Sequence, residues 1–274
     1  MAKSKNDPKS SQAPKISSKS PPLLKRSTKL VRKIAVDLWR TDLHAKEIGI
    51  KKQEEYMAKS RQFTRDMDII GEIKENGKEN GTIGARIRED RDRCVVKAFA
   101  GSFRWLGTIE ESVSRGISQS LSADRIFPAF TLIIDDYDYL LEIEKIRGGL
   151  GFRETFHFGL ILENGQMVSF SIEEKKLGIG DDWAIKNPAN EEIASIDGKK
   201  LDIGGEWEIS YFNEAMAENS AFVTSLILFS ASRRFHGEIE KRIETYREQL
   251  RKGEPIKLQN EELDLLRNPR SMKK

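Results

Sequence analysis

Two copies of one pattern decide the fold: residues 175–185 read KKLGIGDDWAI, and residues 199–209 read KKLDIGGEWEI. The copies are offset by 24 residues, and Ile172 and Ile196 extend the match backwards. A repeat of 24 residues accommodates two strands and two turns. Repeated hairpins bury a shared apolar face only when neighbouring units stack or the sheet closes on itself. The repeat therefore predicts a closed barrel or a tightly curled sheet, with its Trp and Ile side chains inside.

Alternating apolar residues before the repeat predict further antiparallel strands. Within residues 155–162, Phe156 and Phe158 share one face of an expected strand. Asn164 and Gly165 follow as an Asn-Gly pair, which is a strong hairpin signal. Shorter strand patterns lie at 130–134, 139–143, 167–172 and 193–196. Strands at this spacing predict an antiparallel sandwich or barrel.

The pattern becomes helical after the last expected strand. Residues 219–232 carry no charge, and a helix that is apolar on all sides is buried in protein or in lipid. These fourteen residues rise only ~21 Å, which is less than the ~30 Å hydrocarbon core of a bilayer. We therefore expect a helix surrounded by the sheet, with a membrane span as the alternative. A charged helix is expected over 238–252, ended by Glu254 and Pro255.

Charge is distributed unevenly, although the formal net charge of the chain is only +3. Residues 1–33 hold ten Lys and Arg against one acid, which gives +9, whereas residues 34–236 give −8. Residues 1–28 are also rich in Pro and Ser, so they cannot bury enough apolar surface to become ordered and are predicted to be disordered. A basic tail of this kind binds polyanions, namely lipid headgroups, nucleic acid or an acidic protein patch. The alternative is a solubilising tail without a specific partner.

A helical pattern follows the tail over residues 29–62. Leu30, Ile34 and Leu38 recur every four residues, with Lys and Arg between them. A basic amphipathic helix that carries a Trp can lie on a membrane surface, or it can pack its apolar stripe on the rest of the protein. The candidate membrane-facing apolar residues are Leu30, Ile34, Leu38 and Trp39. The accompanying candidates for binding an anionic ligand are Lys25, Arg26, Lys29, Arg32 and Lys33.

The repeat supplies further basic candidates, because each copy begins with a Lys-Lys pair. Recurrence at one structural position places both pairs on one rim of the expected sheet. There they predict either an anionic-ligand patch or solvated hairpin ends. The residues are Lys175, Lys176, Lys199 and Lys200.

Three aspartates in an expected turn are weak candidates for a hard cation such as calcium. They are Asp135, Asp136 and Asp138. They lack the Gly position and the closing Glu of an EF-hand loop, so a solvated turn is the preferred interpretation. The sequence accordingly predicts no metal and no cofactor.

The sequence offers no recognisable catalytic centre. Cys94 is the single cysteine, and the three histidines are far apart along the chain. No GxSxG elbow, HExxH pair, GxGxxG loop or P-loop occurs. One cysteine excludes an internal disulfide framework, and no fully apolar run approaches the ~18 residues of a membrane span. We therefore expect a protein that is not an enzyme and is intracellular, either cytoplasmic or peripheral at a membrane.

Hairpin repeats followed by a short apolar helix resemble the tubby C-terminal-like superfamily, and within it the LURP-one-related proteins and the phospholipid scramblases. The resemblance covers residues 130–235 and rests on the strand cadence and the apolar run 221–229. It implies a closed antiparallel barrel around one hydrophobic C-terminal helix, and a module that binds membrane surfaces or phosphoinositides. The chain departs from the family in lacking a cysteine-rich palmitoylation segment and a match to the calcium-associated acidic segment. The resemblance therefore does not lead us to expect lipid scrambling as an activity of this chain.

Together these patterns predict a mainly β protein, namely a closed antiparallel β-barrel around a hydrophobic C-terminal helix, with flanking N- and C-terminal helices. The expected parts are a disordered tail (1–28), an amphipathic helical segment (29–62), a barrel domain (63–236) and a charged helix with a tail (237–274). Residues 63–126 have a weaker strand pattern, and they either complete the barrel or form a separate unit.

The leading functional hypothesis is a non-enzymatic protein that binds anionic lipid headgroups at a membrane surface, through the basic tail and the helix that follows it. The alternative is a structural or interaction subunit of a larger assembly, whose tail binds RNA or an acidic protein partner. The apolar stripe with Trp39 favours the membrane, because RNA does not need a continuous apolar face.

Overall fold

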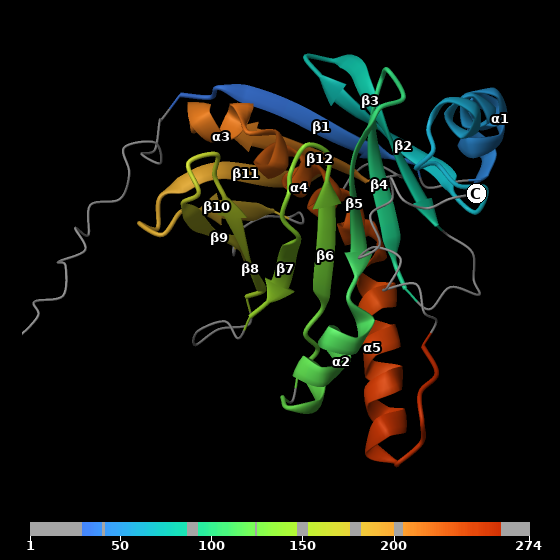
Figure 1. Cartoon of the computed structure of the whole chain (residues 1–274), viewed down its shortest axis with the longest axis vertical. Coiled ribbons are helices and arrows are strands. Elements are labelled where there is room, and N and C mark those ends of the chain that lie inside the picture. Colours follow the sequence, from blue (N-terminus) through green and yellow to red (C-terminus); the bar gives the residue numbers. More distant parts are fainter. Residues whose placement is uncertain are drawn as a thin grey trace, which may run out of the picture.

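A computed structural model describes residues 29–39, 42–86, 93–123, 125–146, 153–175, 182–199 and 205–258, and for 42–50 it describes the backbone alone. Within these residues, twelve antiparallel strands form one closed barrel (Figure 1). The predicted fold class, a mainly β protein built on a closed antiparallel barrel, is confirmed.

The elements follow the chain in a simple order, and each strand from β2 to β11 pairs with the next one in sequence. The strands are β1 (Arg32–Leu38), β2 (Asp68–Glu75), β3 (Lys78–Arg86), β4 (Val95–Ala100), β5 (Trp105–Glu111), β6 (Ala129–Ile134), β7 (Leu141–Lys145), β8 (Thr155–Ile161), β9 (Met167–Glu174), β10 (Trp183–Lys186), β11 (Glu192–Lys199) and β12 (Glu206–Tyr211). The helices are α1 (Asp42–Lys59), α2 (Val113–Leu121), α3 (Glu214–Glu218), α4 (Ser220–Ser232), the 3₁₀ helix η2 (Arg233–Phe235) and α5 (His236–Arg251).

Strand β1 closes the barrel because it is paired on both sides. Val36 lies opposite Trp207 of β12 and opposite Ile73 of β2. The repeat identified in the sequence lies beside this closure, since Trp183 on β10 and Trp207 on β12 flank β11 and are both buried. A closed sheet has no edge strand whose unpaired N–H and C=O groups invite another chain.

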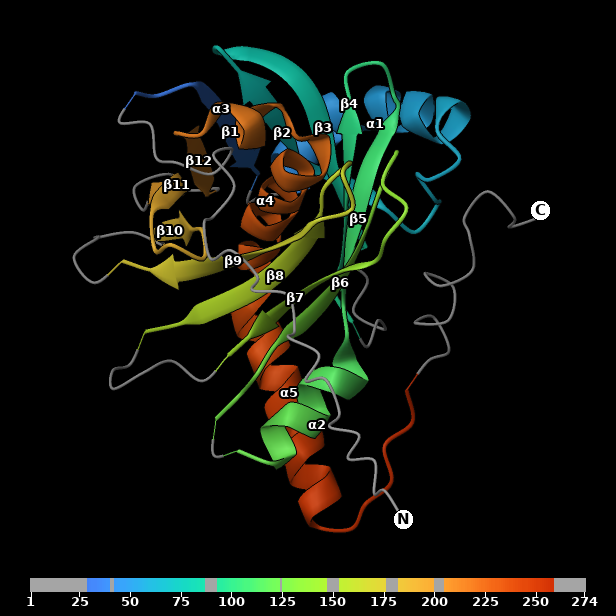
Figure 2. The ribbon, with the colours of Figure 1, turned by 60° about the vertical axis from the view of Figure 1, so that its left-hand side comes forward.

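The alternating strand directions give the barrel two ends. The upper rim carries the start of β1, the end of β12 and every second turn, namely β2–β3, β4–β5, β6–β7, β8–β9 and β10–β11. In Figure 1 the turn β6–β7 lies above the head of β6. The lower rim carries the end of β1 and the connections between the other strand ends, including α2. Helix α5 extends below this rim and packs on α2 (Figure 2).

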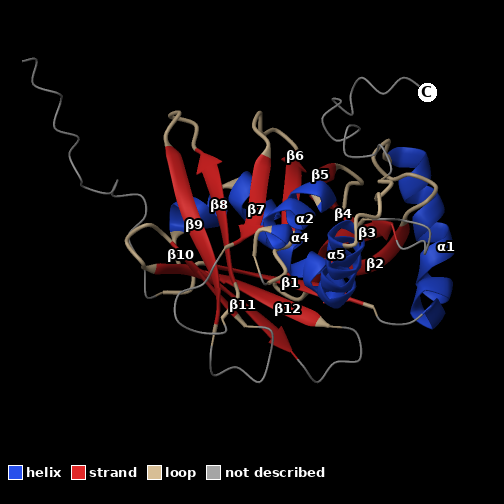
Figure 3. Cartoon of the chain, turned by 90° about the horizontal axis from the view of Figure 1, so that it is seen from below, coloured by secondary structure: helices blue, strands red, loops and turns tan. Residues whose placement is uncertain are grey.

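Helix α4 is buried at twelve of its thirteen positions. It begins after Asn219, whose side chain accepts a hydrogen bond from the Phe222 N–H (2.8 Å). The Phe222 ring lies 5.0 Å from the ring of Phe170, and the Phe229 ring lies 5.2 Å from that of Phe156. Two buried serines donate to backbone carbonyls one turn earlier, which satisfies their hydroxyls. In Figure 3 the helix lies between β6 and β12, and it contacts both strands.

A second, smaller core lies on the outside of the sheet, where α1 and the turn after it cover strands β2–β4. It consists of Tyr56, Phe63, Met67, Ile69 and Phe99. The Tyr56 hydroxyl donates to Thr82 Oγ1 (3.0 Å), so this buried polar group is satisfied. Gly84 permits the close packing, because a Cβ there would lie 3.0 Å from the Phe63 ring.

The helix predicted over residues 29–62 is wrong in its first part, because Arg32–Leu38 form strand β1. Ile34 and Leu38 are four positions apart, which fits a helix, but with Val36 between them they also alternate as in a strand. All three side chains belong to the barrel core. Helix α1 occupies only the later part of the predicted segment.

The barrel also begins earlier than predicted. The expected boundary at residue 63 leaves out β1, without which the sheet does not close. Residues 63–126 contribute β2 to β5 and α2, so they are part of the barrel and not a separate unit. The charged helix expected over 238–252 corresponds to α5. The predicted tails lie outside the described residues at 1–28 and 259–274.

The position of β1 can be tested by comparing two neighbouring apolar residues. Replacing Ile34 with Ala is expected to lower the free energy of unfolding by about 2–4 kcal/mol, because Ile34 is buried in the barrel core. Replacing the exposed Leu30 with Ala should change it by no more than about 0.5 kcal/mol. Urea denaturation followed by tryptophan fluorescence measures both values. Equal effects of the two substitutions would contradict the placement of β1 inside the barrel.

Candidate functional site

The described lysines of the repeat lie toward the same end of the barrel, but their charges are already paired. Lys175 follows β9 and Lys199 ends β11, and both strands run toward the lower rim. Their ammonium groups lie 2.9 Å from Glu192 and 2.7 Å from Glu206, respectively. The structure therefore does not gather them into a patch of uncompensated positive charge. The predicted members of this patch that lie outside the described residues are Lys176 and Lys200.

The basic residues of β1 are paired as well. Arg32 Nε lies 2.7 Å from Glu75 Oε1, and its Nη1 donates to the carbonyl of Ala217 on α3 (2.8 Å). The hydrogen bond to Glu75 raises the pKa of Arg32, because it stabilises the charged guanidinium. Lys33 is exposed and pairs with Glu208 (2.7 Å). Both predicted anion-binding residues thus contribute to ion pairs of the barrel itself.

The outer face of β11, β12, β1 and β2 carries more acidic than basic side chains. Asp197 lies opposite Glu208, and Glu206 lies opposite Asp37, which in turn lies opposite Glu72. Desolvation and the neighbouring carboxylates raise the pKa of Asp197, because both disfavour its charged form. Lys33, Lys199 and Lys74 pair with Glu208, Glu206 and Asp37 on this face, so its acidic excess is small, and the face is not a basic patch.

Three of the four predicted membrane-facing residues do not face solvent freely. Ile34 and Leu38 are buried inside the barrel, so this part of the prediction is wrong. Trp39 is half-buried and packs against the small outer core. Leu30 is exposed as predicted, and its neighbour Val31 is exposed too. The physical reason is the strand conformation of β1, which turns alternate residues inward.

The basic candidates closest to the barrel in sequence are only partly described. Lys29 is exposed where the described chain begins. The two candidates that lie outside the described residues are Lys25 and Arg26. Immediately after Lys29, the Val31 N–H donates to the carbonyl of Tyr211 (2.9 Å). The tail therefore joins the barrel at the upper rim, beside the end of β12.

The three aspartates that were weak metal candidates lie in the β6–β7 turn at the upper rim. Arg104 Nη1 lies 2.9 Å from Asp135 Oδ2 and 3.5 Å from Asp136 Oδ2. Asp138 is exposed. In the described part of the chain, the carboxylates of this turn are not a group whose oxygens converge closely enough to share a cation. The cation that pairs with this turn is the guanidinium of Arg104.

Next to this turn lies an exposed apolar surface that no sequence pattern indicated. We define the upper-rim patch as Tyr139, Leu140 and Met167, which are 49%, 50% and 73% exposed. Tyr139 and Leu140 immediately precede β7, and Met167 begins β9, where it is paired with Ile161 of β8. The Ile161 N–H donates to the Tyr137 hydroxyl (2.8 Å), which ties the β6–β7 turn to the end of β8.

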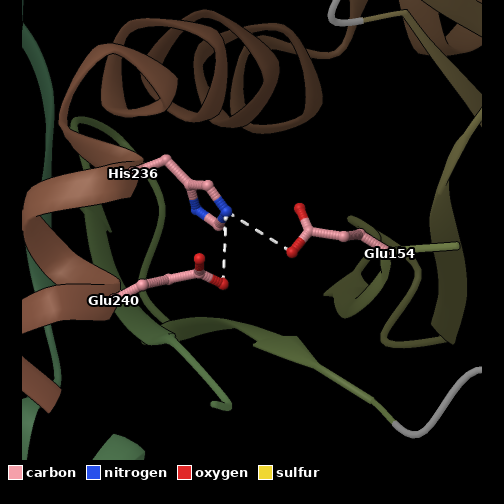
Figure 4. Close-up of side chains that lie close together, drawn as sticks. All are labelled: Glu154, His236 and Glu240. Atoms are coloured by element: carbon pink, nitrogen blue, oxygen red, sulfur yellow. Dashed lines mark ion pairs between the residues drawn. The ribbon is translucent and has the colours of Figure 1, made fainter. Parts of the chain in front are cut away.

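One histidine and two glutamates converge near the lower rim (Figure 4). His236 and Glu240 lie one turn apart at the start of α5, and Glu154 immediately precedes β8. His236 Nε2 lies 3.4 Å from Glu154 Oε1 and 3.3 Å from Glu240 Oε1. The i, i+4 spacing of His and Glu is a signal in the sequence, but only the tertiary fold adds Glu154. These ligand types suit a divalent cation such as zinc.

Two basic side chains occupy this cluster and leave no room for a metal ion in this arrangement. Lys145 Nζ pairs with Glu154 and lies 3.0 Å from Glu240 Oε1. Arg233 Nη2 donates to Glu154 Oε2 (3.3 Å), and its Nη1 lies 2.9 Å from His236 Nδ1. Because a guanidinium has no acceptor, Nδ1 accepts and the ring proton sits on Nε2, toward the carboxylates. This tautomer offers a metal no Nε2 lone pair, so the residues do not fit a metal site.

The cluster fastens α5 to the barrel. Burial alone would raise the pKa of Glu154, but the hydrogen bond from His236, the charge of Arg233 and the hydrogen bond from Lys145 outweigh it. Together they hold the pKa of Glu154 well below its usual range. The Arg233 guanidinium also lies over the ring of Trp183, with Cζ 4.7 Å from the centroid. The cluster is therefore a structural ion-pair network at the exit of α4.

A second ion pair anchors α5 farther along the helix. Arg242 Nη2 donates to Glu111 Oε2 (2.7 Å), and the same oxygen accepts from the Cys94 N–H (3.0 Å). Glu111 is fully buried, and desolvation raises its pKa despite the charge of Arg242. The pair joins α5 to the end of β5, so it too serves the packing of the helix.

Lys97 on β4 is a buried lysine on the outer side of the sheet, beneath the turn that follows α1. It is only 7% exposed, and its Nζ donates to the carbonyl of Gln62 (2.8 Å). Desolvation, with a smaller contribution from the charge of Arg86, lowers the pKa of Lys97 to about 8. Residues 60–67 thus shield the Lys97 ammonium from water, whereas the unfolded chain exposes it.

No family model, curated protein or solved structure matches the chain. In the described part of the chain, no helix is both long enough and apolar enough to cross a membrane.

Removing the central carboxylate of the lower-rim cluster should destabilise the fold. Replacing Glu154 with Gln is expected to cost about 2 kcal/mol at pH 7, because Arg233 and Lys145 lose their shared partner. The folded-state pKa of Glu154 is depressed, so its contribution is complete above the unfolded value near 4.5 and is lost progressively as the pH falls toward the folded value. Urea denaturation should show the gap between wild type and variant narrowing from pH 6 to pH 3. The exposed Glu248, replaced with Gln on the same helix, is the control and should show no such gap.

The buried lysine predicts a second pH dependence, of the same sign but in the alkaline range. Because the folded-state pKa of Lys97 is about 8 and the unfolded value is 10.5, the unfolded chain binds more protons between these values, and stability rises with pH across that window. Relative to a Lys97→Met variant, the wild type should gain about 2 kcal/mol between pH 7 and pH 10. Urea denaturation of both proteins at the two pH values measures this difference. Parallel pH profiles would show that Lys97 is not buried as a cation at neutral pH.

Proposed function

We propose that this chain is a non-enzymatic peripheral membrane protein of the tubby-like and scramblase-like class, which binds anionic lipid headgroups through its basic N-terminal residues. The barrel, folded around α4 as a central hydrophobic helix, is the rigid body that carries this segment. The observation that supports the proposal is the junction at residues 29–31. There, exposed apolar side chains follow directly after the basic tail.

The junction combines the two components of binding to a membrane surface. Leu30 and Val31 are 48% and 42% exposed, and Lys29 lies beside them. The hydrogen bond from the Val31 N–H to Tyr211 fixes this apolar pair at the upper rim. Residues 23–26, Leu-Leu-Lys-Arg, repeat the same combination. Aliphatic side chains enter the boundary between headgroups and acyl chains, whereas Lys and Arg attract anionic lipids.

Charge supplies the larger part of the expected affinity and sets the orientation. Residues 1–33 carry +9, and each basic residue near an anionic membrane contributes about 1 kcal/mol. Residues 34–236 carry −8 and are repelled by the same surface. We expect the protein to bind with its N-terminal end toward the membrane, and to bind more weakly as salt screens the attraction.

A tail that binds RNA or an acidic protein partner is the second candidate function. A segment of this charge binds phosphates through counterion release, whatever molecule carries them. Leu30 and Val31 favour the lipid, because charge-driven binding to RNA gains nothing from two exposed aliphatic side chains. Trp39 no longer distinguishes the two candidates, since it packs beside the outer core.

Vesicle flotation tests the proposal. The full chain should float with phosphatidylcholine vesicles that contain phosphatidylserine and should not float with phosphatidylcholine alone. Deletion of residues 2–28 should abolish flotation, and because the deletion ends before β1, all twelve strands remain. Replacing Leu30 and Val31 together with Ser should weaken binding about tenfold, since two partly exposed aliphatic side chains no longer enter the membrane.

Two controls make the result specific. Replacing Leu250 with Ser removes an exposed apolar side chain from α5, far from the junction, and should leave flotation unchanged. An RNA oligomer added in excess should not release the protein from anionic vesicles. Failure to float at physiological salt would overturn the proposal, as would complete release by RNA combined with no effect of the Leu30 and Val31 substitutions.

A further inference from the structure

We propose that the basic N-terminal residues 1–28 bind, within the same chain, to the upper-rim patch and to the carboxylates that surround it. The barrel thereby competes with the membrane for its own tail. This consequence for membrane binding rests on the proposed function, whereas the intramolecular contact does not.

The upper-rim patch is an apolar surface on well-packed turns. The Tyr139 ring lies 5.5 Å from the ring of Tyr137, which is itself hydrogen-bonded to the backbone of β8. Met167 begins β9 and is paired with Ile161, the β8 residue whose N–H bonds to Tyr137, and a methionine side chain adapts readily to different apolar partners. Large apolar side chains gathered in the open at one corner of a molecule mark an interaction surface.

Carboxylates flank the patch on both sides. Asp136 and Asp138 precede it in the β6–β7 turn, Glu163 lies in the β8–β9 turn, and all three are exposed. Arg104 pairs with Asp135 and Asp136, so four carboxylates and one guanidinium leave this corner negative. An anionic membrane or RNA is repelled here. A segment that combines basic and apolar residues is complementary to the corner in both respects.

The chain supplies a segment of this composition. Residues 1–28 contain seven Lys and Arg against the single acid Asp7. Leu23 and Leu24 are followed directly by Lys25 and Arg26, so two aliphatic side chains stand next to two cations. The aliphatic pair matches the upper-rim patch, and the cations match the carboxylates of the two turns.

The tail is long enough to reach the patch from its point of attachment. The chain enters the barrel at the start of β1, and four neighbouring steps around the sheet separate β1 from β9 on the same rim. At ~4.8 Å between strands these steps amount to about 19 Å, which about six extended residues can span. Counting back from Lys29, where the described chain begins, such a span to Met167 ends near Leu23 and Leu24. The tether also makes the contact intramolecular, with an effective concentration in the roughly millimolar range, so a modest affinity is sufficient.

Site-specific photocrosslinking in the full chain tests the contact. A benzoylphenylalanine introduced at Tyr139 should, on irradiation at low salt, crosslink to residues 1–28 of the same chain, which mass spectrometry of the monomer band identifies. The triple substitution Asp136→Asn, Asp138→Asn and Glu163→Gln should reduce this crosslink at least fivefold. The same probe at Leu250, an exposed apolar residue on α5, is the matched control and should not crosslink to the tail.

The outcomes separate the intramolecular contact from its alternatives. A tail crosslink in the monomer that depends on the three carboxylates supports the proposal. Crosslinks found only in a dimer band would assign the tail to a second copy and overturn it. No tail crosslink, or equal yields at Tyr139 and Leu250, would also overturn it.

The regulatory consequence is tested separately with vesicles. The triple carboxylate variant should bind phosphatidylserine vesicles severalfold more tightly than the wild type, because the tail no longer has an internal competitor. If neither protein floats but the crosslink forms, the proposed membrane function fails and the intramolecular contact stands. If the wild type floats but no tail crosslink forms, the membrane function stands and the contact fails.

Discussion

The pairing of β1 with both β12 and β2 is the interaction on which the rest of the structure depends. Without it the sheet has two open edges, and the inward side chains of β1 lose the interior that covers them. Closure also positions Arg32 to reach Glu75 and the carbonyl of Ala217, which connects the upper rim to α3. The exposed junction at Leu30 and Val31 exists because the chain becomes part of the sheet immediately afterwards.

Charges in this protein serve two different purposes. On the barrel, most basic side chains that the sequence offered as ligand-binding groups are bound to carboxylates, as Lys33 is to Glu208 and Lys199 is to Glu206. Near the lower rim, the network around Glu154 holds α5 in place. The excess positive charge resides in residues 1–33, and the acidic excess resides in the body. This separation favours recognition of anions by the N-terminal segment and recognition of basic segments by the barrel.

Repetition and alternation allowed the closed antiparallel barrel to be predicted from sequence, because a hairpin repeat and period-two burial are local properties. The conformation of β1 was not predictable in the same way. Ile34 and Leu38 satisfy both a helical and a strand period, and only pairing with strands distant in sequence decides between them. The His236 cluster and the upper-rim patch were missed for a related reason: their members become neighbours only after the sheet has formed. Single residue types, such as a lysine pair, also do not reveal which carboxylates will face them.

The closure of the barrel has a consequence for how the protein is made. Arg32 lies opposite Tyr211, 179 positions later, so the first strand to leave the ribosome must wait for the last one. During that interval β1 presents an unpaired edge and three large aliphatic side chains to its surroundings. Pairing over such a separation is slow, and exposed edges are prone to aggregation. We expect the nascent chain to depend on chaperones until β12 and α4 have emerged, and truncated products that end before β12 to be degraded or to aggregate.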